Sequence, residues 1–259
     1  MNAAAPKIRL KNLHKRFGDN VVLNGLNLDV RVGESVVIMG GSGSGKSVSL
    51  KCLLGLIRPD QGEIEIDGES ILGINEDARD DINRKFGMLF QHAALFDSMT
   101  VLDNVTFGLI RGKGMSPSDA AEVAYEKLDQ VGLDNIFGSR SPSELSGGQR
   151  KRVGLARAIA LEPEIILFDE PTTGLDPVMG DAINELIVQC TRNLKATTVT
   201  ITHDMASARV IADRIAMLYK GRIIWVGPAA EVDASGNSHV DQFIHGRAEG
   251  PIKMELRRI

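Results

Sequence analysis

The spacing of apolar positions changes several times along the 259-residue chain, and these changes predict an order of strands and helices. Residues 8–17 and 21–30 are rich in strand-forming residues, and Gly18-Asp19-Asn20 joins them, which predicts a β-hairpin. Shorter strands are expected at 35–39, 63–66, 86–90, 165–169 and 198–201. Helical spacing is found at 46–56, 101–109, 118–131, 147–161, 178–193 and 205–212.

The order of these elements predicts the domain organisation. Strands that alternate with helices indicate an α/β fold, and residues from about 92 to 161 form a predicted helical subdomain inserted into it. Residues 215–219 and 223–226 predict a closing hairpin. We therefore expect one domain over 1–228 and a C-terminal extension over 229–259, whose first part is polar and contains glycine.

Residues 40–47 fit the phosphate-loop pattern G-x-x-x-x-G-K-[ST], between a predicted strand and a predicted helix. Glycines let backbone N–H groups converge on phosphate oxygens, and the helix N-terminus adds a favourable partial charge. Lys46 is expected to reach the β- and γ-phosphates of ATP, and the Ser47 hydroxyl to bind Mg²⁺. An ordinary glycine-serine turn is the alternative. The predicted nucleotide contacts are Gly40, Gly41, Ser42, Gly43, Ser44, Gly45, Lys46, Ser47 and the backbone N–H of Val48.

A second candidate site follows the apolar run 165–168, where Asp169 and Glu170 stand side by side. Ligands gather at the carboxyl ends of strands in open α/β sheets, so both carboxylates are expected near the phosphate loop. Asp169 is expected to support Mg²⁺ through a water molecule, and Glu170 to polarise the water that attacks the γ-phosphate. A solvated acidic pair at a strand end is the alternative.

The string Leu145-Ser146-Gly147-Gly148-Gln149 opens a predicted helix between these two motifs. Its serine hydroxyl and N–H groups lie at the positive end of that helix, which favours an anion. With the phosphate loop before it and Asp169-Glu170 after it, the chain resembles the nucleotide-binding subunits of ATP-binding cassette (ABC) transporters. The resemblance covers about residues 7–228. It implies a P-loop NTPase core with an N-terminal antiparallel β-subdomain and an inserted helical subdomain.

The ABC resemblance implies roles for four further residues. Gln91 resembles the Q-loop glutamine that bridges Mg²⁺, water and the helical subdomain, and His203 resembles the switch histidine that contacts the γ-phosphate. Asp176 resembles the D-loop residue that crosses the dimer interface. Phe17 resembles the aromatic residue that stacks on adenine. A core phenylalanine at a strand end is the alternative for Phe17.

The signature string also implies a homodimer. The chain's own phosphate loop already accounts for one ATP, so a second anion site requires another explanation. Ser146, Gly147, Gly148 and Gln149 are expected to cap the γ-phosphate of ATP bound by a second copy, arranged head to tail about a two-fold axis. A serine-capped helix without a ligand does not by itself explain the two adjacent glycines, which weaken a helix start.

Two shorter strings narrow the resemblance. Arg150-Lys151-Arg152-Val153, taken with residues 169–177, is similar to the ATPases of Mce-type lipid transporters. Residues 240–244 and 250–252 are similar to the C-terminal segment of the ATPase in the Mla lipid-asymmetry system. These similarities imply a peripheral subunit on integral membrane permease subunits, at the cytoplasmic face of the inner membrane. It would power phospholipid transport, and the lipid would contact other subunits only.

The C-terminal extension presents Val240, Phe243 and Ile244 at helical spacing. A helix that short is marginal alone, so we expect its apolar face to dock on the opposite protomer or on a small accessory subunit. Loose packing on its own domain is the alternative. Residues 92–99 are apolar for a surface connection, and we expect them to line a groove that receives a permease helix.

Bulk properties limit the alternatives. Thirty Lys and Arg against 34 Asp and Glu give a net charge of −4, so no nucleic-acid partner is expected. No stretch approaches the roughly 18–20 apolar residues of a membrane span, and we expect a cytoplasmic protein held at the membrane by its partners. A soluble ABC ATPase, an ATPase of an importer for another cargo, and a P-loop kinase or GTPase are the competing functions. Residues 145–149 argue against the last of these.

Overall fold

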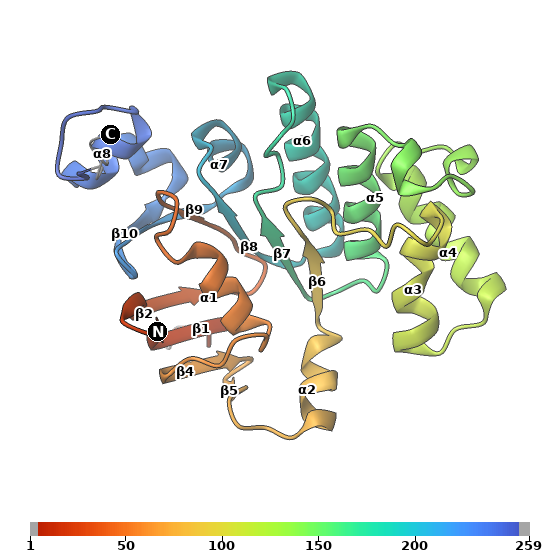
Figure 1. Ribbon diagram of the computed structural model, residues 1–259, viewed down its shortest axis with the longest axis horizontal. Helices are drawn as coiled ribbons and strands as arrows, with labels where there is room; N and C mark the ends of the chain where they lie inside the picture. Colours follow the sequence, from red (N-terminus) through yellow and green to blue (C-terminus); the bar gives the residue numbers. More distant parts are fainter. Residues whose placement is uncertain (1–4, 254–259) are drawn as a thin grey trace.

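The computed structural model describes residues 5–253, whose strands form two sheets (Figure 1). The antiparallel sheet has the order β2 (Asn20–Val30), β1 (Ile8–Phe17), β4 (Gln61–Ile66) and β5 (Glu69–Ser70). The larger sheet has the order β10 (Arg222–Pro228), β9 (Arg214–Tyr219), β3 (Ser35–Met39), β8 (Thr197–Thr202), β7 (Ile165–Asp169) and β6 (Phe86–Leu89). This arrangement confirms the predicted P-loop core with an N-terminal antiparallel subdomain.

The antiparallel sheet packs on the larger sheet and on helix α1 (Lys46–Leu53). Alternate residues of β1, such as Ile8 and Leu10, are buried, as expected for a sheet with one covered face. Phe17 pairs with Asn20, so Gly18 and Asp19 alone form the turn, one residue shorter than predicted. Together with side chains of β3, β7 and β8, these strands build one of the two apolar cores.

The larger sheet is parallel from β6 through β7, β8 and β3 to β9, and only β10 pairs antiparallel at its edge. Val36 to Met39 of β3 are all at most 1% exposed, because helices or strands cover both faces. The carboxyl ends of β3, β7 and β8 therefore lie at one edge, where the phosphate loop, Glu170 and His203 follow them.

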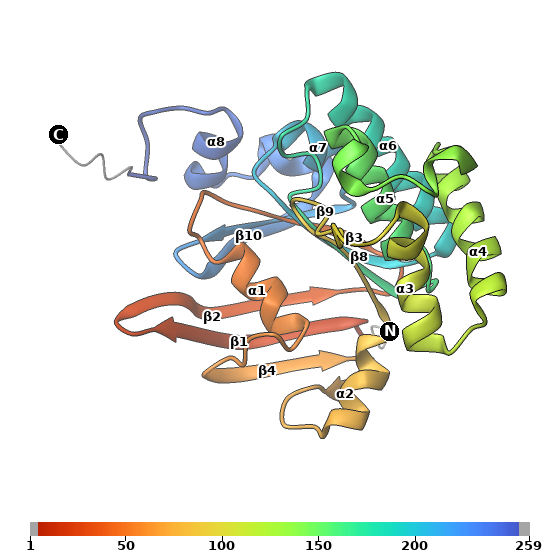
Figure 2. The same ribbon diagram turned by 45° about the vertical axis from the view of Figure 1, so that its right-hand side comes forward.

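The helical subdomain consists of α3 (Val101–Lys113), α4 (Pro117–Gln130) and α5 (Gly147–Ile159), with short 3-10 turns at Asn135–Phe137 and Pro142–Glu144. α5 packs on both other helices and on β6. The second core joins this subdomain to α6 (Pro177–Leu194) and α7 (Met205–Ile211). Figure 2 shows α3 and α4 at the end of the molecule opposite to the C-terminal helix α8 (Ser238–Ile244).

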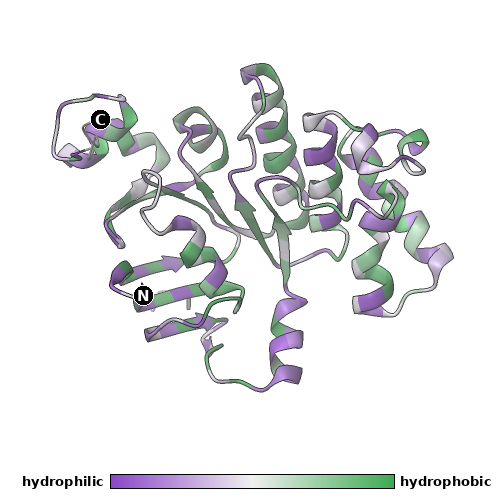
Figure 3. Ribbon diagram, viewed as in Figure 1, coloured by the Kyte–Doolittle hydropathy of each residue, from purple (hydrophilic) through white to green (hydrophobic). Residues whose placement is uncertain are grey.

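Two differences from the predicted elements have local causes. The first helix ends at Leu53 because Gly55 turns to φ 72°, so Leu56 is 66% exposed instead of completing the apolar face. Helix α2 (Glu76–Asn83) was not predicted. It contains no buried residue and is almost entirely hydrophilic (Figure 3), so no apolar period marks it.

Residues 229–253 of the C-terminal extension pack on their own domain, which corrects the expectation that the apolar face of residues 240–244 docks elsewhere, and residues 254–259 lie outside the described part of the chain. After a 3-10 turn at Ala229–Ala234, α8 buries Val240 to 1% exposure in the second core. The His239 ring packs at a tilt against Tyr219 of β9, with ring centroids 4.9 Å apart. Phe243 and Ile244 are partly buried against the same core, so α8 packs within the subunit, and at Val240 more tightly than the alternative of loose packing predicted.

None of the helices in residues 5–253 combines the length and apolar character needed to cross a membrane.

Candidate nucleotide-binding site

The phosphate loop runs from the end of β3 to the first turn of α1, as its motif predicts. Gly43 and Gly45 have φ angles of 75° and 109°, which favour glycine. A Cβ atom on Gly45 would lie 2.9 Å from the carbonyl oxygen of Val22. One on Gly40 would lie 2.3 Å from the carbonyl oxygen of Leu218. The glycines therefore let the loop pass directly against β2 and β9.

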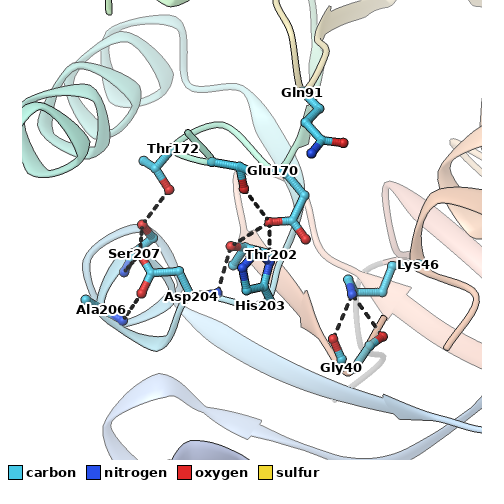
Figure 4. A network of polar contacts seen from close by, with 12 residues as sticks. Gly40, Lys46, Gln91, Glu170, Thr172, Thr202, His203, Asp204, Ala206 and Ser207 are labelled. Carbon is cyan, nitrogen blue, oxygen red and sulfur yellow. Dashed lines mark hydrogen bonds and ion pairs between the residues drawn. The ribbon is translucent and has the colours of Figure 1, made fainter. Parts of the chain in front are cut away.

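Lys46 is buried at the first position of α1, and its ammonium group turns back into the loop (Figure 4). Its Nζ donates to the carbonyl oxygens of Gly40 at 2.7 Å and Gly41 at 3.2 Å. Burial lowers the pKa of Lys46, while the carboxylates of Glu170 and Asp169 oppose that shift. Because its hydrogen bonds go to neutral carbonyl groups, the ammonium charge stays available to a phosphate oxygen.

Asp169 ends β7 with one buried carboxylate oxygen, Oδ1, that has no hydrogen-bond partner among the described residues. Burial and the neighbouring Glu170 carboxylate raise the pKa of Asp169. Oxygen ligands of this kind suit Mg²⁺, which usually takes one or two protein ligands and completes its shell with phosphate and water. Within residues 5–253, no group of three or more His, Cys, Asp or Glu side chains is placed to hold a metal ion.

Glu170 follows Asp169 with a φ of 49°, an uncommon conformation for a residue with a side chain. Its Oε2 accepts hydrogen bonds from the hydroxyls of Thr173 at 3.1 Å and Thr202 at 3.3 Å. His203 Nδ1 lies 2.9 Å from the same oxygen (Figure 4). These contacts converge on one carboxylate oxygen and hold the side chain, which is only 12% exposed, in one orientation.

One cavity of about 760 Å³ collects most of the predicted groups. Its wall residues are Asn20, Val22, Gly41, Ser42, Gly43, Ser44, Gly45, Lys46, Ser47, Val48, Gln91, Glu170, His203 and Phe243. The phosphate loop, the Q-loop glutamine, the carboxylate and the histidine come from four separate segments. The fold therefore assembles the phosphate-facing part of the predicted site within one chain.

The signature residues 146–149 do not line this cavity. Ser146 caps α5: its hydroxyl accepts the N–H of Gln149 at 3.2 Å, and the Gln149 side chain accepts the N–H of Ser146 at 2.9 Å. A Cβ atom on Gly148 would lie 2.5 Å from Met179 Cε. Gly148 thus packs against the flexible end of the Met179 side chain on α6.

Asp176 and Phe17 also lie outside the cavity wall. Asp176 caps α6, accepting the backbone N–H groups of Val178 at 3.1 Å and Met179 at 3.0 Å. Phe17 is 49% exposed at the end of β1, and Lys15 Nζ lies 5.4 Å from its ring centroid. That exposure argues against the alternative of a core phenylalanine.

Sequence reasoning missed three groups around the cavity. Thr202, the residue before His203, reaches Glu170, and its place at the end of a β-branched strand gave no chemical signal. Phe243 enters the wall from α8, far along the chain. Lys151 is 5% exposed and sits beneath the carboxylates. Burial lowers the pKa of Lys151 to about 8, while Asp169 and Glu170 oppose that shift.

A smaller hollow, of about 380 Å³, lies beside the helical subdomain. Its wall residues are His92, Ala94, Leu95, Asp97, Pro142, Ser143 and Arg150. Phe96 is 43% exposed next to it and packs on Phe107, with ring centroids 5.0 Å apart. Residues of the segment 92–99 thus line a groove, as predicted.

Comparison with known proteins identifies the family. Residues 23–173 match the ABC transporter family. The chain is 41% identical to a "probable ribonucleotide transport ATP-binding protein mkl" of Mycobacterium leprae, over 95% of this chain and 71% of that protein. It is 37% identical to the "intermembrane phospholipid transport system ATP-binding protein MlaF" of Haemophilus influenzae, over 96% of this chain and 94% of that protein. A "sulfate/thiosulfate import ATP-binding protein CysA" of Pseudomonas putida is 42% identical over 92% of this chain and 71% of that protein.

A solved structure agrees with these relatives. The dimeric ATP-binding cassette MJ0796, in a post-hydrolysis state bound to ADP and Pi, superposes with a TM-score of 0.78. The two sequences are 36% identical, and the superposition covers 86% of this chain and 98% of the solved chain. The chain therefore belongs to the ABC transporter ATPases, as a subunit that binds ATP and hydrolyses it.

Proposed function

We propose that this subunit powers phospholipid transport across the cell envelope, as a homodimer bound to permease subunits at the cytoplasmic face of the inner membrane. The observation that carries the lipid assignment is the alignment with MlaF, which covers 94% of that protein. The mkl and CysA proteins are covered to 71%, so each has sequence outside the shared part. Their names make another cargo, such as a ribonucleotide or sulfate, the second candidate.

In the hydrolytic step we assign each side chain of the cavity one task. Lys46 binds the β- and γ-phosphates, and the loop glycines orient them through backbone N–H groups. Ser47 and Gln91 would supply oxygen ligands for Mg²⁺ and Asp169 would hold the ion through a water molecule, and the bound ion would neutralise phosphate charge. Glu170, held by Thr202, Thr173 and His203, accepts a proton from the attacking water. His203 also contacts the γ-phosphate.

We assign a second, composite surface to Ser146, Gly147, Gly148, Gln149 and Asp176. In one chain these residues lie outside the cavity, which supports a role toward ATP held by the other protomer. Ser146 opens the 13-residue helix α5, whose positive end favours the γ-phosphate. The relative solved as a dimer supports the same arrangement. Phe17 is assigned to adenine stacking because its ring is exposed beyond the loop.

The groove at residues 92–99 is assigned to the permease. Its apolar side chain Leu95, with exposed Phe96 alongside, suits a short amphipathic helix. The C-terminal extension buries Val240 in its own domain, so an accessory subunit would have to contact the outer side of α8. We retain that contact as a proposal for residues 238–244.

The test is transport by the reconstituted complex. The subunit, co-purified with its membrane permease, is placed in proteoliposomes that contain a fluorescent phospholipid. ATP should move the lipid, and Glu170→Gln should abolish movement while ATP still binds. Stimulation of ATP hydrolysis by sulfate or a ribonucleotide, with no lipid movement, would replace the lipid assignment with the second candidate.

A further inference from the structure

Helix α5 sends a buried lysine beneath the hydrolytic site. Lys151 Nζ donates to the main-chain carbonyl oxygen of Gln91 and to that of Glu170, the latter at 3.2 Å. Gln91 and Glu170 follow neighbouring parallel strands, β6 and β7. The Lys151 side chain therefore joins the two segments behind their functional groups and contacts neither the Gln91 amide nor the Glu170 carboxylate.

The segments that α5 binds are strained. Glu170, Ala93 and Ala94 have φ angles of 49°, 59° and 46°, in the left-handed region that non-glycine residues avoid. Arg157, six residues after Lys151 on α5, donates to the carbonyl oxygens of Ala94 at 2.7 Å and Ala93 at 2.5 Å. Both basic residues thus stabilise carbonyl groups that the unusual backbone turns toward the helix.

Packing brings α5 close enough for these bonds. A Cβ atom on Gly154 would lie 3.0 Å from Ala93 Cβ and 2.8 Å from Leu89 Cδ1. Glycine at this position therefore lets the helix rest directly on β6 and on the turn after Gln91. Three residues of α5, Lys151, Gly154 and Arg157, therefore contact β6 or the segment from Gln91 to Ala94.

We propose that Lys151 is a positioning residue for ATP hydrolysis, which fixes the main chain of Glu170 relative to Gln91 and to the helix that begins at Ser146. The same helix would then set the carboxylate at this chain's ATP and present Ser146 to the partner's ATP. The proposal rests on the hydrolytic role assigned to Glu170 above. It adds a residue whose own side chain touches no reacting atom.

The first experiment separates binding from turnover. Lys151→Met keeps the apolar stem and removes both hydrogen bonds. In the permease complex it should lower kcat by about 10-fold or more, because charged hydrogen bonds at the site are lost. KM for ATP should change by less than about 3-fold, since Lys46 and the loop remain. A normal kcat, or an equal loss in kcat and in ATP affinity, overturns the proposal.

Lys127→Met is the matched control. Lys127 is also buried in the helical subdomain, at 4% exposure, and pairs with Glu162 at 3.0 Å. It contacts neither Gln91 nor Glu170. Its kcat should stay within about 2-fold of the unaltered protein. Should Lys151→Met fold poorly by thermal denaturation, Lys151→Gln retains a shorter N–H donor. Folded Lys151→Gln should show an intermediate kcat, and an unaltered kcat overturns the proposal.

The second experiment tests whether Lys151 acts through Glu170. Residual single-turnover hydrolysis is compared for Glu170→Gln and for Glu170→Gln combined with Lys151→Met. If the lysine works by placing the carboxylate, the second change should lower the residual rate by less than about 2-fold. A loss as large as in the unaltered background refutes the linkage. Near-normal hydrolysis by Glu170→Gln alone refutes instead the role assigned to Glu170.

Discussion

His203 Nδ1 lies 2.9 Å from Glu170 Oε2, so the residue after β8 and the residue after β7 are joined across the strand ends. The His203 side chain is 60% exposed and borders the cavity, which leaves its other ring nitrogen free to face a nucleotide. Glu170 is largely covered, so the histidine contacts it from the solvent side. Thr202 holds the same carboxylate oxygen from within the sheet.

Thr202→Val should lower the ATP turnover of the complex by about 10-fold, the effect of one hydrogen bond to a charged carboxylate, with KM for ATP nearly unchanged. Thr200→Val is the control, because Thr200 is equally buried on β8 and its hydroxyl has no partner within the described residues. That control should hydrolyse ATP normally and be at least as stable. Steady-state kinetics checks both, and equal turnover by the two variants would remove Thr202 from the site.

The composite site predicts complementation between two inactive variants. Ser146→Arg should abolish dimer-dependent turnover and spare the nucleotide affinity of the monomer, because Ser146 lies outside its own cavity. Lys46→Ala should lose both ATP turnover and nucleotide affinity. In a mixed dimer, the loop of the Ser146→Arg chain meets an intact signature, so one site should occlude ATP. Occlusion no greater than in either homodimer, in mixtures shown to form heterodimers, would disprove the trans arrangement.

The groove beside the helical subdomain predicts a loss of assembly. Leu95→Glu with Phe96→Glu should place charge against the apolar side of an amphipathic helix in the groove, and should release the subunit from the permease. Ile136→Glu is the control, since Ile136 is 66% exposed on the same subdomain and does not line the groove. Co-purification from detergent extracts is the measurement. If the double variant co-purifies with the permease at control levels, the groove is not the permease-binding site.

The C-terminal extension predicts different results at two neighbouring positions. Val240→Ala should cost about 2 kcal/mol of the free energy of unfolding, because Val240 is 1% exposed in the second core. Phe243→Ala should raise the Kd for ATP by about 5-fold through loss of an apolar wall, and Ile244→Ala should leave it unchanged. Urea unfolding and equilibrium nucleotide binding check these. Identical affinities for the Phe243 and Ile244 variants would show that α8 does not contact the nucleotide.

A partly exposed ion cluster around Lys7 and Asp67 predicts pH-dependent stability. Burial alone would raise the pKa of Asp67, but hydrogen bonds from Lys7 and Lys85 outweigh it and lower that pKa below its ordinary value of 3.8. A depressed carboxyl pKa stabilises the fold above the ordinary value and loses this effect as pH falls through the folded value. Asp67→Asn should therefore destabilise by about 1 kcal/mol at pH 7, given the partial exposure of Asp67. The difference in free energy of unfolding between the variant and the unaltered protein should disappear as the pH falls below 3.8. A difference that does not depend on pH would contradict the mechanism.

The local pattern was sufficient for most elements because strands and helices follow from residue spacing and capping. Strand Ser35–Met39, the phosphate loop and strand Ile165–Asp169 lie where the sequence predicts them, since each is a short apolar run with a chemical motif at its end. Helix α2 escaped prediction because it buries no residue. The packing of Val240 was predicted wrongly because spacing shows an apolar face and not what covers it.

The sequence by itself therefore determined the family, most of the order of elements and the phosphate loop that lines the cavity, all of which depend on contiguous strings. Only the tertiary structure decided which distant groups support them. Lys151 reaches the carbonyl of Gln91 across 60 positions, and Thr202 reaches Glu170 across 32. Such contacts depend on how helices and strands pack in three dimensions, and the local spacing of apolar residues does not specify that packing.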